Sequence, residues 1–114
     1  VVIGAVGTGS FPGGATQSVT NYTIPRLLEE HPLESRVRVA GNVSTVLDDY
    51  RSEAGNVYQQ FYLAGGGERV KVFCSTANGR VNISTAEEVT VTGTFQEFYG
   101  QVEIYTRCAS ISAE

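Results

Sequence analysis

Five segments of the chain alternate between buried-type and polar residues, and this alternation constrains the fold more than any other feature of the sequence. Successive side chains of a strand point to opposite faces of its sheet, so the pattern predicts strands with one buried face. The positions expected on the buried faces form five groups: Val37, Val39, Gly41 and Val43; Val57, Gln59, Phe61 and Leu63; Val70, Val72 and Cys74; Val89, Val91, Gly93 and Phe95; Val102, Ile104, Thr106 and Cys108. The sequence therefore predicts an all-β domain.

Five short amphipathic strands expose unpaired edges unless their sheet closes on itself. A five-stranded Greek-key barrel, the OB fold, solves this with the strands available, and an SH3-like barrel is the main alternative. Gly41 and Gly93 lie inside two predicted strands, as expected where strands coil strongly at barrel corners. One short helix is predicted over residues 24–31, with Pro25 in its first turn and Pro32 after its end.

The first part of the chain differs in composition from the rest, because glycine, serine and threonine dominate it. We predict a flexible leader or tether over residues 1–21 and one OB-fold domain over residues 22–114. The leader is interpreted either as the end of a removed signal or membrane anchor, or as a disordered or cloned N-terminus. No run approaches the ~18 apolar residues of a membrane span, so we expect no membrane insertion by the domain itself.

The chain has two cysteines, Cys74 and Cys108, and a single histidine. These are too few ligands for a structural zinc site within one chain, so no metal is expected. In the OB topology the strands that end at the two cysteines run parallel to each other as neighbours, and both cysteines fall on buried faces. Two interpretations stay open, namely a disulfide and a pair of buried free thiols.

The outward faces of the predicted strands carry aromatic and basic side chains. This set contains Tyr58, Tyr62, Arg69, Lys71, Phe73, Tyr105 and Arg107, together with Arg36 and Arg38 on the first long strand. The second and third strands form the usual ligand face of OB folds. Aromatic rings stack on bases, at about 1–3 kcal/mol per base, while Arg and Lys attract phosphates or carboxylates. We interpret the set as a ligand-binding face.

The alternative interpretation is ordinary strand composition, in which aromatic residues and Arg–Glu pairs are common and Glu103 neutralises Arg107. The formal net charge of −4 comes from 8 basic and 12 acidic residues and gives no general attraction to nucleic acid. Five of the basic residues nevertheless belong to the predicted face. The charge balance therefore does not exclude an anionic ligand there.

Catalysis has little support in the sequence. His31 stands alone in the predicted helix, and no serine or cysteine lies in a recognisable nucleophile motif. Asp48 and Asp49 begin the polar segment 48–55, which is predicted to be a solvated loop, and the Gly65–Gly67 run lacks the Lys-Ser/Thr of a phosphate-binding loop. We therefore expect a binding module that is not an enzyme and needs no cofactor.

Residues 22–108 resemble the OB domain of the cytochrome c maturation heme chaperones. The resemblance lies in Tyr22-Thr-Ile-Pro-Arg-Leu-Leu-Glu, in Arg36-Val-Arg-Val-Ala-Gly-Asn-Val and in Val89-Thr-Val-Thr-Gly-Thr-Phe. Those chaperones attach heme through a His or Cys with a Tyr four residues later, whereas Cys108 is followed by Ala-Ser-Ile-Ser-Ala-Glu. The resemblance implies a tethered, extracytoplasmic or membrane-anchored module without the heme-attachment motif, and a cytoplasmic location is the alternative.

Residues 35–108 also resemble the nucleic-acid-binding OB superfamily, including domains of the tRNA-anticodon type. Three segments carry this resemblance: Arg36-Val-Arg-Val-Ala-Gly-Asn-Val, Tyr58-Gln-Gln-Phe-Tyr-Leu and Arg69-Val-Lys-Val-Phe. The resemblance implies that a single-stranded oligonucleotide binds to the face formed by the second and third predicted β-strands. The candidate ligands of this face are therefore an oligonucleotide, a heme-like molecule or a protein.

Overall fold

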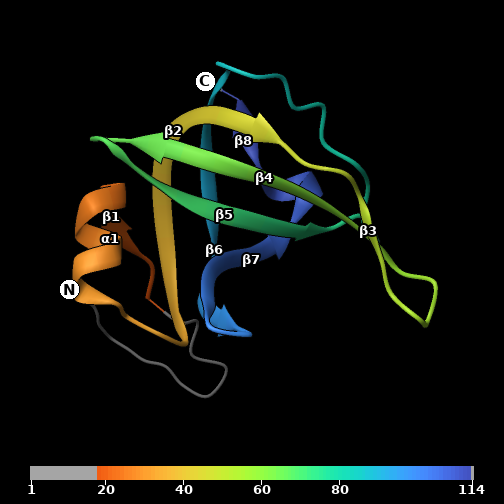
Figure 1. The fold of residues 1–114 in the computed structure, drawn as a ribbon, viewed down its shortest axis with the longest axis horizontal. Helices are drawn as coiled ribbons and strands as arrows, with labels where there is room; N and C mark the ends of the chain where they lie inside the picture. The colour runs from red at the N-terminus through yellow and green to blue at the C-terminus, as the bar shows by residue number, and fades with distance from the viewer. Residues whose placement is uncertain (1–17, 114) are drawn as a thin grey trace.

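Five long strands follow the five alternating segments in the computed structural model, which describes residues 18–113. They are β2 (Ser35–Val46), β4 (Val57–Gly65), β5 (Glu68–Ser75), β6 (Glu88–Phe98) and β7 (Gln101–Arg107). Strand β2 pairs with β4 and with β6, β4 pairs with β5, and β7 joins β5 to β6, so the sheet closes on itself (Figure 1). All these pairs are antiparallel except β5 with β7, which run parallel. The predicted all-β Greek-key barrel is confirmed.

Short elements complete the fold at both ends of the barrel: β1 (Thr20–Tyr22), α1 (Ile24–Glu30), β3 (Tyr50–Arg51), the 3-10 helix η1 (Cys108–Ser110) and β8 (Ser112–Ala113). Strand β1 pairs in parallel with β2. Residues 18–21 of the predicted leader are described, with Thr20 and Asn21 in β1, whereas residues 1–17 lie outside the described residues. Strand β3 forms inside the segment predicted as a polar loop, because it pairs with β4.

Helix α1 covers one end of the barrel, next to the β4–β5 hairpin (Figure 1). Thr23 caps its start by accepting a hydrogen bond from the backbone of Arg26 at 3.3 Å. His31 ends it in the left-handed conformation, with φ of 54°. Ile24 and Leu27 are fully buried against the strands, so tertiary packing holds this seven-residue helix. Within residues 18–113, no helix has the length and hydropathy required to cross a membrane.

Two glycines allow the strands to approach closely at the barrel corners. A Cβ at Gly93 would lie 2.4 Å from the backbone oxygen of Tyr105, and one at Gly41 would lie 2.7 Å from that of Ala64. Any side chain at these positions would push neighbouring strands apart. Inside the barrel, the core is built from the inward positions of the alternating segments: Val37, Val39, Val43, Phe61, Leu63, Val70, Val72, Val89, Val91, Phe95 and Ile104.

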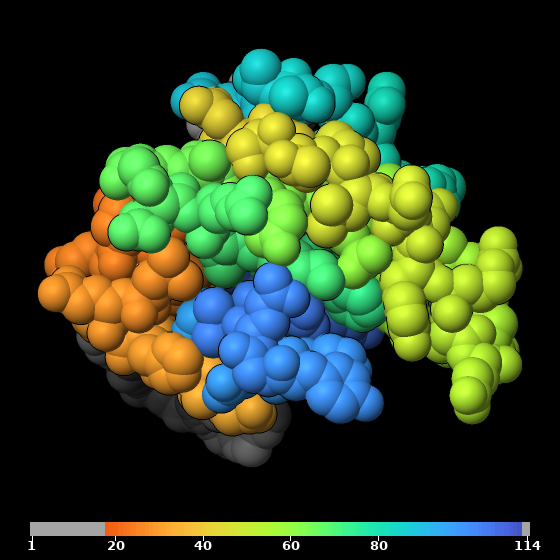
Figure 2. Space-filling model, in the orientation of Figure 1, coloured from red at the N-terminus to blue at the C-terminus, as the bar shows by residue number. Residues whose placement is uncertain are grey.

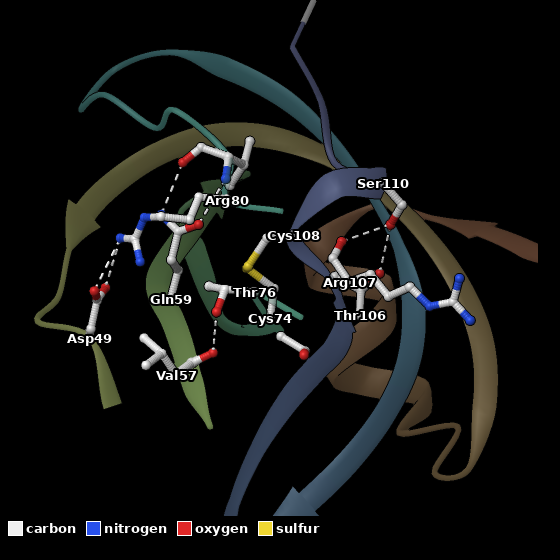
Figure 3. The surroundings of a disulfide bond; sticks show 12 residues. Asp49, Val57, Gln59, Cys74, Thr76, Arg80, Thr106, Arg107, Cys108 and Ser110 are labelled. Atoms are coloured by element: carbon white, nitrogen blue, oxygen red, sulfur yellow. Dashed lines mark hydrogen bonds and ion pairs between the residues drawn. A yellow bond between two sulfur atoms is a disulfide. The ribbon is translucent and has the colours of Figure 1, made fainter. Parts of the chain in front are cut away.

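A disulfide between Cys74 and Cys108 joins the end of β5 to the start of η1, directly after β7 (Figure 3). Its Cα atoms are 4.9 Å apart, both residues are fully buried, and the described part of the chain contains no free cysteine. Nearby, the Gln59 side chain makes two hydrogen bonds to the backbone of Val81, at 2.8 and 2.9 Å. These contacts fasten the polar segment between β5 and β6 to the barrel.

Candidate functional site

A row of four aromatic rings crosses the outer faces of β4, β5 and β7. Tyr58 and Phe73 are stacked, with ring centroids 4.7 Å apart and planes inclined by 20°. Tyr105 continues the row on β7, 6.3 Å from Phe73, and Tyr50 of β3 lies 5.9 Å from Phe73 and 6.1 Å from Tyr58. We call these four residues the aromatic row. Because each ring contacts another, the row is a preformed apolar surface on a rigid sheet.

The aromatic row forms one wall of a cleft of about 550 Å³. The segment between β2 and β4 bounds it on one side through Tyr50 and Ser52, and the turn between β6 and β7 bounds it on the other through Phe98 and Tyr99. Figure 2 shows the hollow between the projecting yellow-green segment and the blue residues beside it. The cleft is open, and its volume exceeds that of a flat group of the size of a base.

The turn between β6 and β7 presents a second aromatic group to solvent. Phe98 is 57% exposed and Tyr99 is 93% exposed, and their ring centroids are 4.4 Å apart. Tyr99 also has a positive φ of 53°, a conformation that costs energy for a residue with a bulky side chain. Exposed neighbouring rings at the edge of a cleft are typical of contact surfaces.

The structure divides the predicted ligand face into three groups of residues and leaves Arg38 apart from all of them. Tyr58, Lys71, Phe73 and Tyr105 all line the cleft. Lys71 extends there, with its ammonium 5.9 Å from the centroid of the Phe73 ring. These four side chains are the part of the predicted site that the fold brings together.

Tyr62 and Arg69 form a separate pair on the same strands, since the Arg69 guanidinium lies 4.2 Å above the Tyr62 ring. The Tyr62 hydroxyl accepts a hydrogen bond from Gln101 at 3.1 Å, at the margin of the cleft. Arg69 itself lines another shallow hollow beside the β4–β5 turn. The pair therefore adjoins the cleft without lining it.

Arg36 and Arg107 line a further hollow, together with Ser110 and Tyr105. Tyr105 lines both this hollow and the cleft, so the two arginines continue the surface of the aromatic row. Arg38 lies elsewhere, on the paired strands β2 and β6, where it donates a hydrogen bond to Thr92 at 3.2 Å. Arg38 is thus not part of the cleft or of this adjoining hollow.

Ion pairs do not neutralise these cations. The described residues contain two ion pairs, Arg26 with Glu30 on α1 and Arg80 with Asp49. The hydrogen bond and charge of Glu30 raise the pKa of Arg26 above its usual value. The predicted neutralisation of Arg107 by Glu103 is wrong, because Glu103 accepts a hydrogen bond from Gln96 at 2.9 Å instead. Arg36, Lys71 and Arg107 therefore keep their charges available.

His31 and Asp49, which were considered for catalysis from the sequence, have other contacts in the structure. His31 lies beside the core, with its ring edge-on to Phe95 at 5.8 Å. Asp49 is occupied by Arg80 (Figure 3), and residues 18–113 contain no cluster of three or more His, Cys, Asp or Glu side chains suited to hold a metal ion.

Several cleft residues are absent from the sequence-based set, notably Tyr50, Phe98, Tyr99 and Glu103. Tyr50 lies in a segment predicted as a polar loop, and Phe98 and Tyr99 lie at a turn, where strand alternation does not apply. The signal that could identify them is simply an aromatic residue in an otherwise polar connection. The alternation of the last predicted strand places Glu103 on the outward face, but the sequence indicates it only as a partner of Arg107.

Comparison with solved structures shows the fold. No protein-family model matches the sequence, and a search of curated proteins finds no significant relative. The OB domain of Ta0387 from Thermoplasma acidophilum matches with a TM-score of 0.62 and 15% identity, over 85% of this chain and 88% of that one. The second OB-fold domain of replication protein A from Methanococcus maripaludis matches with a TM-score of 0.64 and 13% identity, over 82% of this chain and 94% of that one.

A putative aspartyl-tRNA synthetase from Leishmania major Friedlin also matches, with a TM-score of 0.55 and 14% identity. The match covers 93% of this chain but 22% of the synthetase, so the similarity concerns one part of that larger protein. The chain is therefore an OB-fold domain.

Proposed function

We propose that this OB-fold domain binds single-stranded nucleic acid in the cleft and acts without catalysis. The aromatic row is the observation that carries the proposal, since four contacting rings form a platform on which unpaired bases can stack. Each stacked base contributes about 1–3 kcal/mol, whichever base it is. Tyr99 and Phe98, on the opposite side of the cleft, can cover a base from its second face.

The cations lie where a bound strand needs them. Lys71 lies within the cleft, and Arg36 and Arg107 line the hollow that shares Tyr105 with it. A strand that stacks a base on Tyr105 can therefore place a neighbouring phosphate beside the two arginines. Because these residues form no ion pair within residues 18–113, no partner in this part of the chain has to be displaced. The net charge of −4 limits binding to this local surface.

The structural neighbours support an oligonucleotide more than a heme-like ligand. Two of the three are named for a replication protein and a tRNA synthetase, and none is named for heme. Cys108, the residue nearest to the position of the heme attachment site in the heme chaperones, has its sulfur bonded to Cys74. That sulfur is not free to form a covalent bond to heme.

Fluorescence anisotropy with a labelled single strand of mixed sequence, about 12 nucleotides long, tests the proposal. We expect micromolar binding that weakens as salt rises, because phosphate contacts release counterions. The matched duplex should bind much more weakly, since its bases are already stacked within the helix. Absence of binding at tens of micromolar protein in low salt would overturn the proposal.

We also propose that the domain resides in an oxidising compartment outside the cytoplasm. The disulfide supports this placement, because such bonds persist mainly in secreted and periplasmic proteins. A thiol titration of the protein isolated from its native cells, unfolded without reductant, should find no free thiol. Two free thiols per chain would contradict the placement while leaving the nucleic-acid proposal intact.

A further inference from the structure

Glu103 is an unusual residue in the cleft, because it is the one acidic side chain that is buried among residues 18–113. It is 4% exposed and lines the cleft next to the aromatic row. A buried carboxyl group loses its hydration, and this loss is unfavourable unless hydrogen bonds or a counter-charge replace the water. Its position in a candidate binding site therefore requires a physical explanation.

The strand register fixes the surroundings of Glu103. It lies between Lys71 of β5 and Gln96 of β6, and two residues before Tyr105 on the same face of β7. The Gln96 amide donates a hydrogen bond to Oε2 of Glu103 at 2.9 Å. Over the described residues, Oε1 has no hydrogen-bond donor, and neither Lys71 nor Arg107 forms an ion pair with the carboxylate. One oxygen is thus held in place, and the other can still accept.

The charge of Glu103 determines which part of a bound single-stranded nucleic acid can approach it. A carboxylate only accepts hydrogen bonds, and it repels phosphate oxygens. The backbone of a bound nucleic acid is therefore expected near Arg36 and Arg107, in the adjoining hollow, with its bases directed toward Glu103. The Watson–Crick edge of a base is then the group that meets Oε1.

We propose that Glu103 makes the cleft selective for bases that carry an exocyclic amino group. This inference rests on the proposed function. Cytosine presents its N4 amino group as a donor, whereas uracil and thymine present the O4 oxygen at the same position. The carboxylate accepts a hydrogen bond from the N4 amino group of cytosine and repels the O4 oxygen of uracil, whose N3–H is the one donor on that edge and lies between two carbonyl oxygens. Gln96 acts as a positioning residue that orients the carboxylate toward the base.

The direct test compares oligo-dC with oligo-dU of equal length on the wild-type protein, by competition against the labelled mixed strand. Both are pyrimidines of equal ring size, so they differ mainly at the groups that face Glu103. We expect oligo-dC to bind at least about fivefold tighter. Replacing the cytosines by 2-pyrimidinone, which has hydrogen in place of the amino group, should remove this advantage.

A pair of matched variants assigns the preference to Glu103. Glu103→Gln keeps the shape of the side chain and adds an amide donor that can pair with uracil O4, so the dC-to-dU ratio should fall to about one or below. Glu88→Gln removes the same charge at the exposed start of β6. It should raise the affinity for both strands equally and leave their ratio unchanged.

The outcomes separate the two proposals. Absence of binding by the mixed strand and by both homopolymers overturns the proposed function and the selectivity with it. Equal affinity for oligo-dC and oligo-dU overturns the selectivity alone. A preference that persists in folded Glu103→Gln, or in the 2-pyrimidinone strand, also overturns it. Because that strand is tested on the wild-type protein, the result does not depend on the variant folding.

Discussion

The outer surface of the barrel has two halves that arise from the same alternation but differ in chemistry. In the middle of β2 and β6, away from Arg36 and Gln96, polar residues face outward, and Arg38 is hydrogen-bonded to Thr92. On β4, β5 and β7, the outward positions hold three rings of the aromatic row, together with Lys71. Alternation determines which side chains point away from the core, whereas the types of these residues determine which half can bind a ligand.

The two halves also differ in whether their polar side chains have hydrogen-bond or ion-pair partners within the domain. The guanidinium of Arg38 has an internal acceptor, and the threonine methyl groups leave little flat apolar area. In the other half, the rings contact each other and line the cleft, and the neighbouring cations have no acid partner within residues 18–113. The aromatic half therefore has rings and cations that remain available to contact a ligand.

The largest expected effect is loss of the stacking surface. Tyr58→Ala combined with Phe73→Ala should weaken binding of the single strand by at least about thirtyfold, because each ring stacks on a base at about 1–3 kcal/mol. Arg38→Ala combined with Thr92→Ala on the other half should change the affinity by less than about twofold. Anisotropy titrations measure both. Similar losses in both double variants would contradict the distinction between the halves.

Removal of the disulfide tests whether binding depends on the surface alone. Cys74→Ser with Cys108→Ser opens a cross-link between residues 34 positions apart, so the free energy of unfolding should fall by about 3–4 kcal/mol. Chemical denaturation provides this value. The folded variant should keep its affinity, since neither cysteine reaches the cleft. A loss of binding in a protein that is still folded would be inconsistent with this account.

Gly93→Ala tests the contact between β6 and β7, where the two halves meet. The added methyl group would lie 2.4 Å from the backbone oxygen of Tyr105 and would force the strands apart. We expect a loss of about 1–3 kcal/mol in the free energy of unfolding. Thr92→Ala, one residue earlier on the outward face, is the control and should cost less. An unchanged unfolding midpoint for Gly93→Ala would show that the strands can relax without penalty.

The smallest effect concerns the arginines beside the aromatic row. Arg36→Gln with Arg107→Gln should weaken binding severalfold at low salt and reduce the slope of log affinity against log salt by about 1.4, for two phosphate contacts. Arg26→Gln is the control, since Arg26 is already paired with Glu30 on α1. An unchanged slope in the first variant would exclude phosphate contacts at Arg36 and Arg107.

The sequence predicts the barrel because all five long strands show the same alternation, with a period of two residues. Val70, Val72 and Cys74 are buried as the alternation predicts, and the parallel pairing of β5 with β7 follows from the topology. The sequence predicts only some of the residues that line the cleft. Tyr58 and Phe73 were predicted from their outward positions, but Tyr50 joins them through a two-residue strand inside a loop.

The remaining differences have the same physical origin. Phe98 and Tyr99 are brought to the cleft by a turn, and the geometry of a turn has no period that a sequence pattern reveals. Arg38 was assigned to the ligand face because alternation cannot tell which side of a closed barrel an outward residue occupies. Curvature separates it from the cleft, and only the closed structure shows that separation.

Backbone amide chemical shifts of isotope-labelled protein, followed by NMR while a short single strand is added, test the central claim most directly. The account predicts progressive shifts along β4, β5 and β7 and in the turn between β6 and β7. The amides around Arg38 and Thr92 should stay near their starting positions. Shifts confined to the β2–β6 half, or none at saturating strand, would contradict the assignment of the aromatic cleft as the binding site.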